Sequence, residues 1–251
     1  MEKLIVKFPT RNRPDKFKQV FSDYVNYLDD NYRTRFVITC DENDQTMKNN
    51  KIIKWLEDQK SALEERNHSL IYHFGNNKSK IAACNANLEG ESADALLLAS
   101  DDMWIRVDGY NRVILEELKK YFPDGDGAIK FNDGLRSDIL MTLPTIGWKW
   151  YKRFGYIYHP EYTSLYADNE QTLVANYAGR LVINETVLAE HRWTAEPFDE
   201  LHARNENQKM YDIDGEIYKK RMNYRFGIDK LGIDYNWPVD PLKFSVDPLE
   251  S

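Results

Sequence analysis

The stretch Ala95-Leu96-Leu97-Leu98-Ala99-Ser100-Asp101-Asp102 decides the fold class of this 251-residue chain. Its first five residues form an uninterrupted apolar run, which is typical of a parallel strand that helices bury on both faces. The run ends in a serine and two aspartates. Adjacent carboxylates at the end of a buried strand repel each other and lose solvation, and a divalent cation is the usual partner that offsets this cost. Helix capping or a solvated turn is the alternative.

The segments on either side of this stretch alternate between strand and helix patterns. Short apolar runs at 4–8, 36–39 and 70–74 predict strands, and apolar residues that recur at spacings of three and four over 17–28 and 52–63 predict helices. This alternation predicts a mainly parallel sheet covered by helices. The later elements are expected to be helices at about 80–89, 110–121 and 166–177, strands at 127–131, 139–145 and 180–187, and a charged helical tail over 199–225.

Composition excludes several classes of protein. With 42% hydrophobic and 30% charged residues the chain is globular rather than disordered, and a net charge of −7 opposes broad adhesion to nucleic acid. The two cysteines, Cys40 and Cys84, have no zinc-ligand spacing. The apolar runs are too short to span a bilayer, and Met1 leads directly into a predicted strand. We therefore expect a cytoplasmic protein without a leader, in the host cytoplasm if the chain is phage-encoded.

Polar loops follow the predicted strands at their carboxyl ends, where ligands gather in open α/β sheets. Thr10, Arg11 and Arg13 follow the first strand, Asp41 follows the second, and Asp101 and Asp102 follow the fourth. These loops are expected to converge on one site.

The order and spacing of these motifs resemble the GT-A glycosyltransferases, in particular the large family-two group of nucleotide-diphospho-sugar transferases, over roughly residues 3–192. Ser100-Asp101-Asp102 stands where that group has its Asp-x-Asp motif, with a serine in place of the first aspartate. The other matching pieces are the opening loop 8–14, Asp41, the Lys80, Ala83 and Asn85 positions, the acidic pair Asp168 and Glu170, and His191.

The resemblance implies a GT-A-like, Rossmann-like fold: a mixed, mainly parallel sheet flanked by helices, with a helical C-terminal extension. It implies a catalytic domain over 1–195 and an extension over 196–251 packed on the same unit. The residues that the resemblance implies for donor binding are Thr10, Arg11, Arg13, Asp41, Lys80, Asn85 and Asp101. The implied ligands of Mn²⁺ or Mg²⁺ are Asp102, Asp101 and His191. The candidates for the catalytic base are Asp168, which we prefer, and Glu170. Solvated basic residues, a structural histidine and helix-capping carboxylates are the alternative interpretations.

The implied activity is transfer of a sugar from a nucleotide diphosphate donor, with a UDP-sugar as the first choice, to an acceptor hydroxyl. The acceptor could be a saccharide, a protein or a modified DNA base, and Lys219-Lys220-Arg221 with Arg225 is the one basic group that suits a polyanion. The aromatic group 148–151 could form an acceptor platform or a hydrophobic lid. Two alternatives stay open. A nucleotidyltransferase is disfavoured because loop 9–14 lacks glycine, and a non-catalytic GT-A-like binding domain is suggested by the serine of the Ser-Asp-Asp motif.

Overall fold

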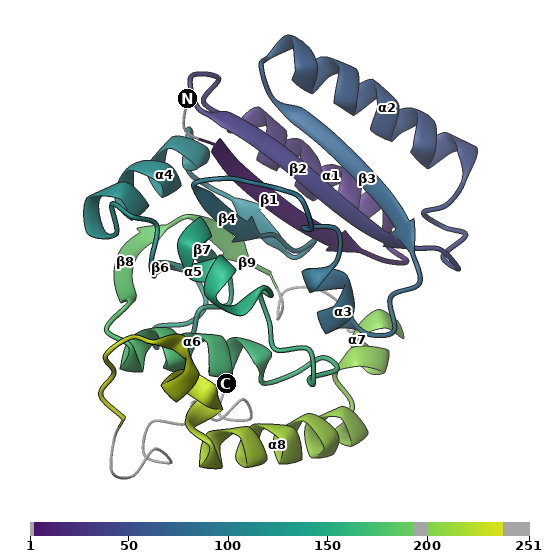
Figure 1. The fold of residues 1–251 in the computed structure, drawn as a ribbon. Helices are drawn as coiled ribbons and strands as arrows, with labels where there is room; N and C mark the ends of the chain where they lie inside the picture. The colour runs from purple at the N-terminus through teal and green to yellow at the C-terminus, as the bar shows by residue number, and fades with distance from the viewer. Residues whose placement is uncertain (1–2, 193–199, 238–251) are drawn as a thin grey trace.

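A computed structural model describes residues 3–192 and 200–237, without the side chain of residue 202 (Figure 1). The first half of the chain alternates strongly between strands and helices. Its elements are β1 (Lys3–Thr10), α1 (Pro14–Asn26), β2 (Arg33–Asp41), α2 (Asn50–Glu65), β3 (Ser69–Gly75), α3 (Lys80–Asn85), β4 (Ala95–Leu98), β5 (Met103–Ile105) and α4 (Tyr110–Tyr121). The second half has β6 (Ala128–Asn132), β7 (Thr145–Gly147), α5 (Trp148–Phe154), α6 (Ala167–Tyr177), β8 (Leu181–Val187), β9 (Ala189–His191), α7 (Glu200–Asn205), α8 (Gln208–Asn223) and η1 (Arg225–Leu231).

The main sheet has seven strands in the order β3-β2-β1-β4-β7-β6-β8. The first four strands of this order are mutually parallel, β7 is antiparallel to β4 and β6, and β6 is parallel to β8. This arrangement confirms the predicted mixed, mainly parallel α/β fold. The predicted central strand is β4, which pairs on both sides and is buried along its whole length.

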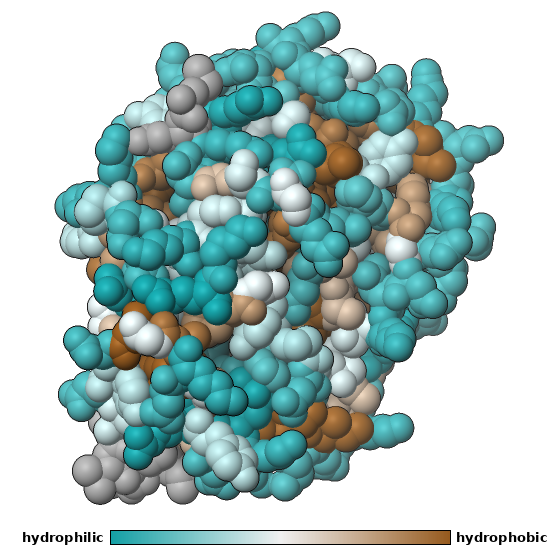
Figure 2. Space-filling view, in the orientation of Figure 1, coloured by the Kyte–Doolittle hydropathy of each residue, from teal (hydrophilic) through white to brown (hydrophobic). Residues whose placement is uncertain are grey.

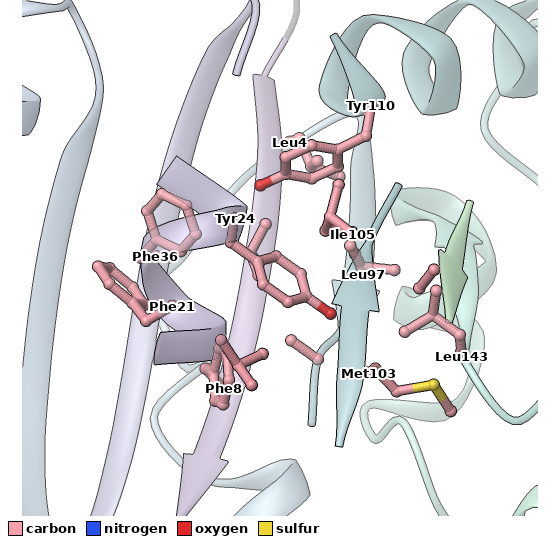
Figure 3. Packing of buried hydrophobic residues seen from close by; sticks show 14 of the residues in the cluster. Leu4, Phe8, Phe21, Tyr24, Phe36, Leu97, Met103, Ile105, Tyr110 and Leu143 are labelled. Atoms are coloured by element: carbon pink, nitrogen blue, oxygen red, sulfur yellow. The ribbon is translucent and has the colours of Figure 1, made fainter. Parts of the chain in front are cut away.

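Aromatic side chains hold α1 on one face of the sheet. Phe17 and Tyr24 of α1 pack against Phe8 of β1, with ring centroids 5.1 and 5.5 Å apart. Figure 3 shows the Phe21 and Tyr24 rings of this helix among side chains of the sheet. All four residues are fully buried. Because aromatic rings bury large apolar areas, this packing fixes the helix above the carboxyl end of β1.

A second, two-stranded sheet places His191 beside the acidic motif. β5 and β9 are antiparallel, and Met103 lies opposite His191 in their register. The Arg192 backbone N–H donates to the Asp102 carbonyl over 2.9 Å, which extends the pairing by one step. Two segments almost ninety positions apart in the sequence are thereby brought together by backbone hydrogen bonds.

The C-terminal helices share a core with the sheet. Tyr218, Met222 and Phe226 belong to the same buried cluster as Ile5 and Leu96 of the sheet. Figure 1 shows α8 lying beyond α6, on the side away from the sheet. The predicted boundary between 195 and 196 lies outside the described residues.

Two predicted elements differ from the structure. The helix expected over 80–89 ends at Asn85, and Asn87 has a left-handed backbone with φ 64°. The strand expected over 139–145 is a loop as far as residue 144, and β7 begins only at Thr145, because the Asp138 carboxylate accepts the Leu140 N–H and holds a turn there. The tail is helical as predicted, and α8 begins separately from α7 where Asn207 caps it by accepting the Met210 N–H.

Polar side chains cover most of the face that Figure 2 shows. The face in Figure 2 is predominantly hydrophilic, and its hydrophobic residues form small separate groups. Within the described parts of the chain, no helix combines the length and the apolar character that a membrane crossing needs.

Candidate functional site

A cavity of about 450 Å³ lies at the carboxyl ends of β1, β2 and β4. The predicted convergence of the strand-end loops therefore occurs. The predicted site residues that line the cavity are Thr10, Arg11, Arg13, Asp41, Lys80, Asp101, Asp102, Asp168 and His191. The structure places Asn85 and Glu170 outside this lining.

The loops after β1 and β2 are joined by polar contacts at the cavity wall. The Arg11 guanidinium binds the Asp41 carboxylate and donates to Asn43 Oδ1 over 2.9 Å. Asn77 Nδ2 donates to the other oxygen of Asp41 over 2.8 Å. The Thr10 hydroxyl is buried in this wall and has no hydrogen-bond partner within the described part of the chain. A polar ligand in the cavity would satisfy it.

The two aspartates of the acidic motif have different environments. Asp101 Oδ1 accepts a hydrogen bond from the Arg13 guanidinium over 3.0 Å, and Asp102 Oδ2 lies 3.8 Å from His191 Nε2. Burial raises the pKa of Asp101 to about 6, with Arg13 opposing the shift. Burial acts on Asp102 in the same direction, but His191, Ser100 and Lys80 together outweigh it and hold the pKa of Asp102 well below its usual range. Asp102 is thus the more firmly ionised carboxylate.

Asp133, which the sequence interpretation did not single out, orients His191. His191 Nδ1 lies 3.2 Å from Asp133 Oδ2, and the His191 N–H donates to the Asp133 carbonyl over 2.8 Å. The Asp133 side chain also accepts the backbone N–H groups of Leu135 and Arg136. Burial alone would lower the pKa of His191, but Asp102 and Asp133 raise it to about 9. The signal for Asp133 was its place at the end of β6, in the polar turn 132–134.

Asp168 and Lys80 both line the cavity. Lys80 precedes the acidic motif in the sequence, and Asp168 follows it. Asp168 lies in the first turn of α6, and burial raises the pKa of its carboxyl group while Lys80 opposes the shift. Lys80 Nζ lies 4.0 Å from Glu206 Oε1. Burial would lower the pKa of Lys80, but Glu206 and other carboxylates raise it. The ammonium therefore stays charged in the cavity wall.

The two predicted site residues outside the lining have structural partners. Asn85 accepts the N–H groups of Ile157 and Tyr158 and donates to the Tyr158 carbonyl. Glu170 is held by Arg221 through two hydrogen bonds of 2.7 Å and accepts a third from the Tyr162 hydroxyl. Neither side chain is therefore directed at the cavity.

The aromatic and basic groups singled out in the sequence also have structural partners. Trp150 and Tyr151 are buried in the core, at 0% and 5% exposure, so they form neither a platform nor a lid at the cavity. Lys219 pairs with Glu216, and Arg221 pairs with Glu170. Lys220 lies 3.9 Å from Glu161. Carboxylates therefore balance the charge of the basic group.

No protein family model matches the chain, and no curated protein matches its sequence. Solved structures match its fold. The mannosyltransferase PcManGT from Pyrobaculum calidifontis, solved with GDP-Man and Mn²⁺, has a TM-score of 0.56 at 12% identity over 80% of this chain and 59% of that chain. S. aureus TarS 1-349 with UDP has 0.53 at 13% identity, over 75% and 59%. GalNAc-T7 with UDP, GalNAc and Mn²⁺ has 0.54 at 11% identity, over 75% and 42%.

The chain has the GT-A fold. It spans between 42% and 59% of the length of these three structures. The GT-A sheet accounts for the position of the cavity, because the switch in strand order on either side of β1 opens a crevice at the carboxyl ends of the strands.

Among the described residues, the acidic and histidine side chains at this cavity do not form a complete metal site by themselves. Over the described ranges, no group of three or more His, Cys, Asp or Glu side chains is arranged to hold a metal ion. Asp102 and His191 offer one carboxylate and one imidazole, and Asp101 is engaged by Arg13. Any metal at this point needs oxygen ligands from a substrate or from water.

Proposed function

We propose that the chain is a metal-assisted glycosyltransferase that moves a sugar from a nucleotide diphosphate donor to an acceptor hydroxyl. One observation carries the proposal: a single cavity of the GT-A fold is lined both by Asp102 with His191 and by Asp168. A pair of metal-binding groups and a separate carboxylate are the two components that such a transfer needs.

The residues present fit a divalent cation bound partly by its substrate. Mg²⁺ is usually held in proteins by one or two carboxylates together with substrate phosphates, and an imidazole ligand shifts preference toward Mn²⁺. Asp102 and His191 would hold the ion, and Asp133 would fix the orientation of the imidazole through Nδ1. When bound, the ion neutralises charge on the diphosphate leaving group. The neighbours PcManGT and GalNAc-T7 were solved with Mn²⁺.

The loops after β1 and β2 would bind the nucleotide. Asp41 and Asn77 offer oxygen and amide groups to a ribose or a base, and the Thr10 hydroxyl is a free donor or acceptor in the same wall. Lys80 adds a positive charge to the cavity, where a diphosphate is the expected anion. We propose a UDP-sugar as the first donor to test, with a GDP-sugar second, because the matched structures hold UDP and GDP-Man.

Asp168 would act as the catalytic base that deprotonates the acceptor hydroxyl. It lies in the cavity lining, whereas Glu170 is bound to Arg221 and Tyr162. A carboxyl pKa raised by burial brings the proton affinity of the base closer to the working pH, which favours proton transfer. Saccharides, proteins and modified DNA bases all carry suitable hydroxyl groups.

A thermal-shift screen tests this proposal. UDP, GDP and their sugars are added to the wild type with Mn²⁺, with Mg²⁺ or with EDTA, and to Asp102→Ala and the exposed control Asp108→Ala. At about 100 times the dissociation constant, a ligand stabilises the folded state by about 2.7 kcal/mol. We expect a metal-dependent shift with one nucleotide that Asp102→Ala loses and Asp108→Ala keeps. The absence of any nucleotide shift in the wild type would refute the proposed function.

A further inference from the structure

A buried aspartate of the C-terminal helix α8 holds the loop that leads to Asp168. Asp214 is 0% exposed, and its carboxylate accepts the backbone N–H groups of three consecutive residues. The distances are 2.9 Å from Thr163 N, 2.7 Å from Ser164 N and 2.8 Å from Leu165 N. Hydrogen bonds to an ionised acceptor are stronger than neutral ones, so this contact fixes the loop backbone firmly.

The residue after this loop has a backbone conformation that needs support. Tyr166 is the N-cap of α6 and has φ 62° and ψ −7°, in the left-handed region that non-glycine residues rarely adopt. Such conformations persist where the surrounding structure determines them, and they cluster at functional sites. Tyr166 stands two positions before Asp168.

The same face of α8 holds the Tyr166 ring. The rings of Tyr218 and Tyr211 lie 5.3 and 6.4 Å from it, between centroids. Gly215 lies against the ring, since a Cβ atom there would be 3.6 Å from it. Residues 211, 214, 215 and 218 follow the spacing of three and four that places them on one side of a helix. One face of α8 therefore contacts both the loop and the start of α6.

The loop also carries a polar group without a partner. Ser164 is 6% exposed and lines the cavity, and its hydroxyl has no hydrogen-bond partner over the ranges that the structure describes. Buried hydroxyls are normally hydrogen-bonded, so this group is suited to a ligand in the cavity. Asp214 thus fixes the backbone of Ser164, whose hydroxyl can form a hydrogen bond in the cavity. It also fixes the turn that precedes Asp168.

We propose that Asp214 is a positioning residue for the acceptor side of the active site. Its carboxylate fixes the loop 163–165, so that the Ser164 hydroxyl faces the acceptor and the first turn of α6 directs Asp168 at the acceptor hydroxyl. This inference rests on the proposed function, because it assigns the loop to the side of the cavity that the catalytic base occupies. Asp214 itself contacts no substrate.

The test compares Asp214→Asn with Asp214→Glu and with the matched control Asp212→Asn. Asp212 is an exposed aspartate on the same helix, and its side chain accepts a hydrogen bond over 2.8 Å from Gln208, which is also exposed. An asparagine at 214 keeps the shape but replaces one acceptor oxygen by a donor that faces backbone N–H groups. The glutamate keeps the charge and the acceptors and displaces them by one methylene group.

Each variant is titrated with the nucleotide that stabilises the wild type, which gives the concentration of folded nucleotide-binding sites. Turnover per site is then measured as release of nucleoside diphosphate from the corresponding sugar nucleotide, with water as the acceptor. We expect Asp214→Asn to keep the donor KM within about twofold and to lose about 10- to 100-fold in kcat, the range that misplacement of a catalytic group by about 1 Å produces. Asp214→Glu should retain more activity than Asp214→Asn, and Asp212→Asn should match the wild type.

Three results would overturn the inference. Wild-type kcat per binding site in Asp214→Asn would show that the loop contact does not position the base. Loss of nucleotide binding in both variants at position 214 would assign Asp214 to the stability of the fold. A wild type that binds nucleotide but releases no diphosphate would leave no reaction for Asp214 to support. Failure of the proposed function is recognised separately, as a wild type that binds no nucleotide.

Discussion

Replacing Arg221 by leucine should destabilise the protein strongly, because the change leaves a buried carboxylate without its cation. Arg221 donates to both oxygens of Glu170 over 2.7 Å, and the two side chains are 14% and 6% exposed. In the variant, the Tyr162 hydroxyl still donates to Glu170. Breaking a buried ion pair by removal of one partner costs about 3–5 kcal/mol. For a domain of this size, that corresponds to a fall in Tm of roughly 6–20 °C.

The loss of stability should depend on pH. Burial raises the pKa of Glu170, and Arg221 opposes the shift. Without Arg221 the pKa of Glu170 in the folded state rises further above its value in the unfolded state. Protonated Glu170 therefore stabilises the folded state at low pH, and this stabilisation is lost as the pH rises through the folded-state pKa. The stability difference between Arg221→Leu and the wild type should therefore be larger at pH 7 than at pH 5.

The assay is equilibrium unfolding in urea at pH 5 and pH 7, followed by circular dichroism, on the wild type, Arg221→Leu and Arg221→Leu with Glu170→Gln. The double variant removes the unpaired charge, so we expect it to recover a large part of the lost stability and to lose the dependence on pH. A single variant within about 1 kcal/mol of the wild type, or one whose deficit grows as the pH falls, would refute the reasoning. This threshold lies well below the loss of about 3–5 kcal/mol that is expected when one partner of a buried ion pair is removed.

Two further predictions concern the cavity. Asp168→Asn should lower kcat about 10²- to 10⁴-fold while the nucleotide-induced thermal shift stays unchanged, and release of nucleoside diphosphate at the wild-type rate would remove Asp168 as the base. Asp133→Asn should weaken the binding of Mn²⁺ in the presence of nucleotide about 10- to 100-fold, because the side chain that orients His191 loses its charge. A Mn²⁺ titration of the thermal shift measures this affinity, and an unchanged value would show that His191 needs no support from Asp133.

The sheet and its helices can be predicted from the sequence because residues close together in the sequence mark each strand and helix. The apolar run 95–99, which contains β4, is long enough for a strand and lies between Asp94 and Ser100, and the helix over 14–26 has both a proline in its first turn and a repeating apolar face. The stretch 139–144, which was predicted as a strand, has a similar apolar content, but its buried residues lie in a loop that Asp133 and Asp138 hold by accepting backbone N–H groups. An apolar run predicts burial, whereas the backbone conformation of a short run depends on partners that a single sequence does not reveal.

The same distinction applies to the cavity. Residues that follow the strands were predictable as a group, because parallel strands end at one edge of a sheet. Asp133 contacts His191, and Asp214 accepts hydrogen bonds from the backbone of loop 163–165. Both partners are about 50 or more positions away in the sequence, and only the tertiary structure brings each pair together. Their roles became visible with the β5–β9 pairing and with the placement of α8 against the loop 163–165.

The acidic pair on α6 shows that helix geometry already constrains such predictions. Successive residues of an α-helix are rotated by about 100°, so Asp168 and Glu170 point in nearly opposite directions and cannot both face one cavity. The structure shows this division: Asp168 lines the cavity, and Glu170 is buried against Arg221 of α8. The same spacing that directs one carboxylate at the proposed acceptor thus directs the other at the C-terminal helices. Through Glu170 and Asp214, α8 contacts α6 and the loop before it at two buried carboxylates, so we expect the stability of α8 and the geometry of the proposed base to be coupled.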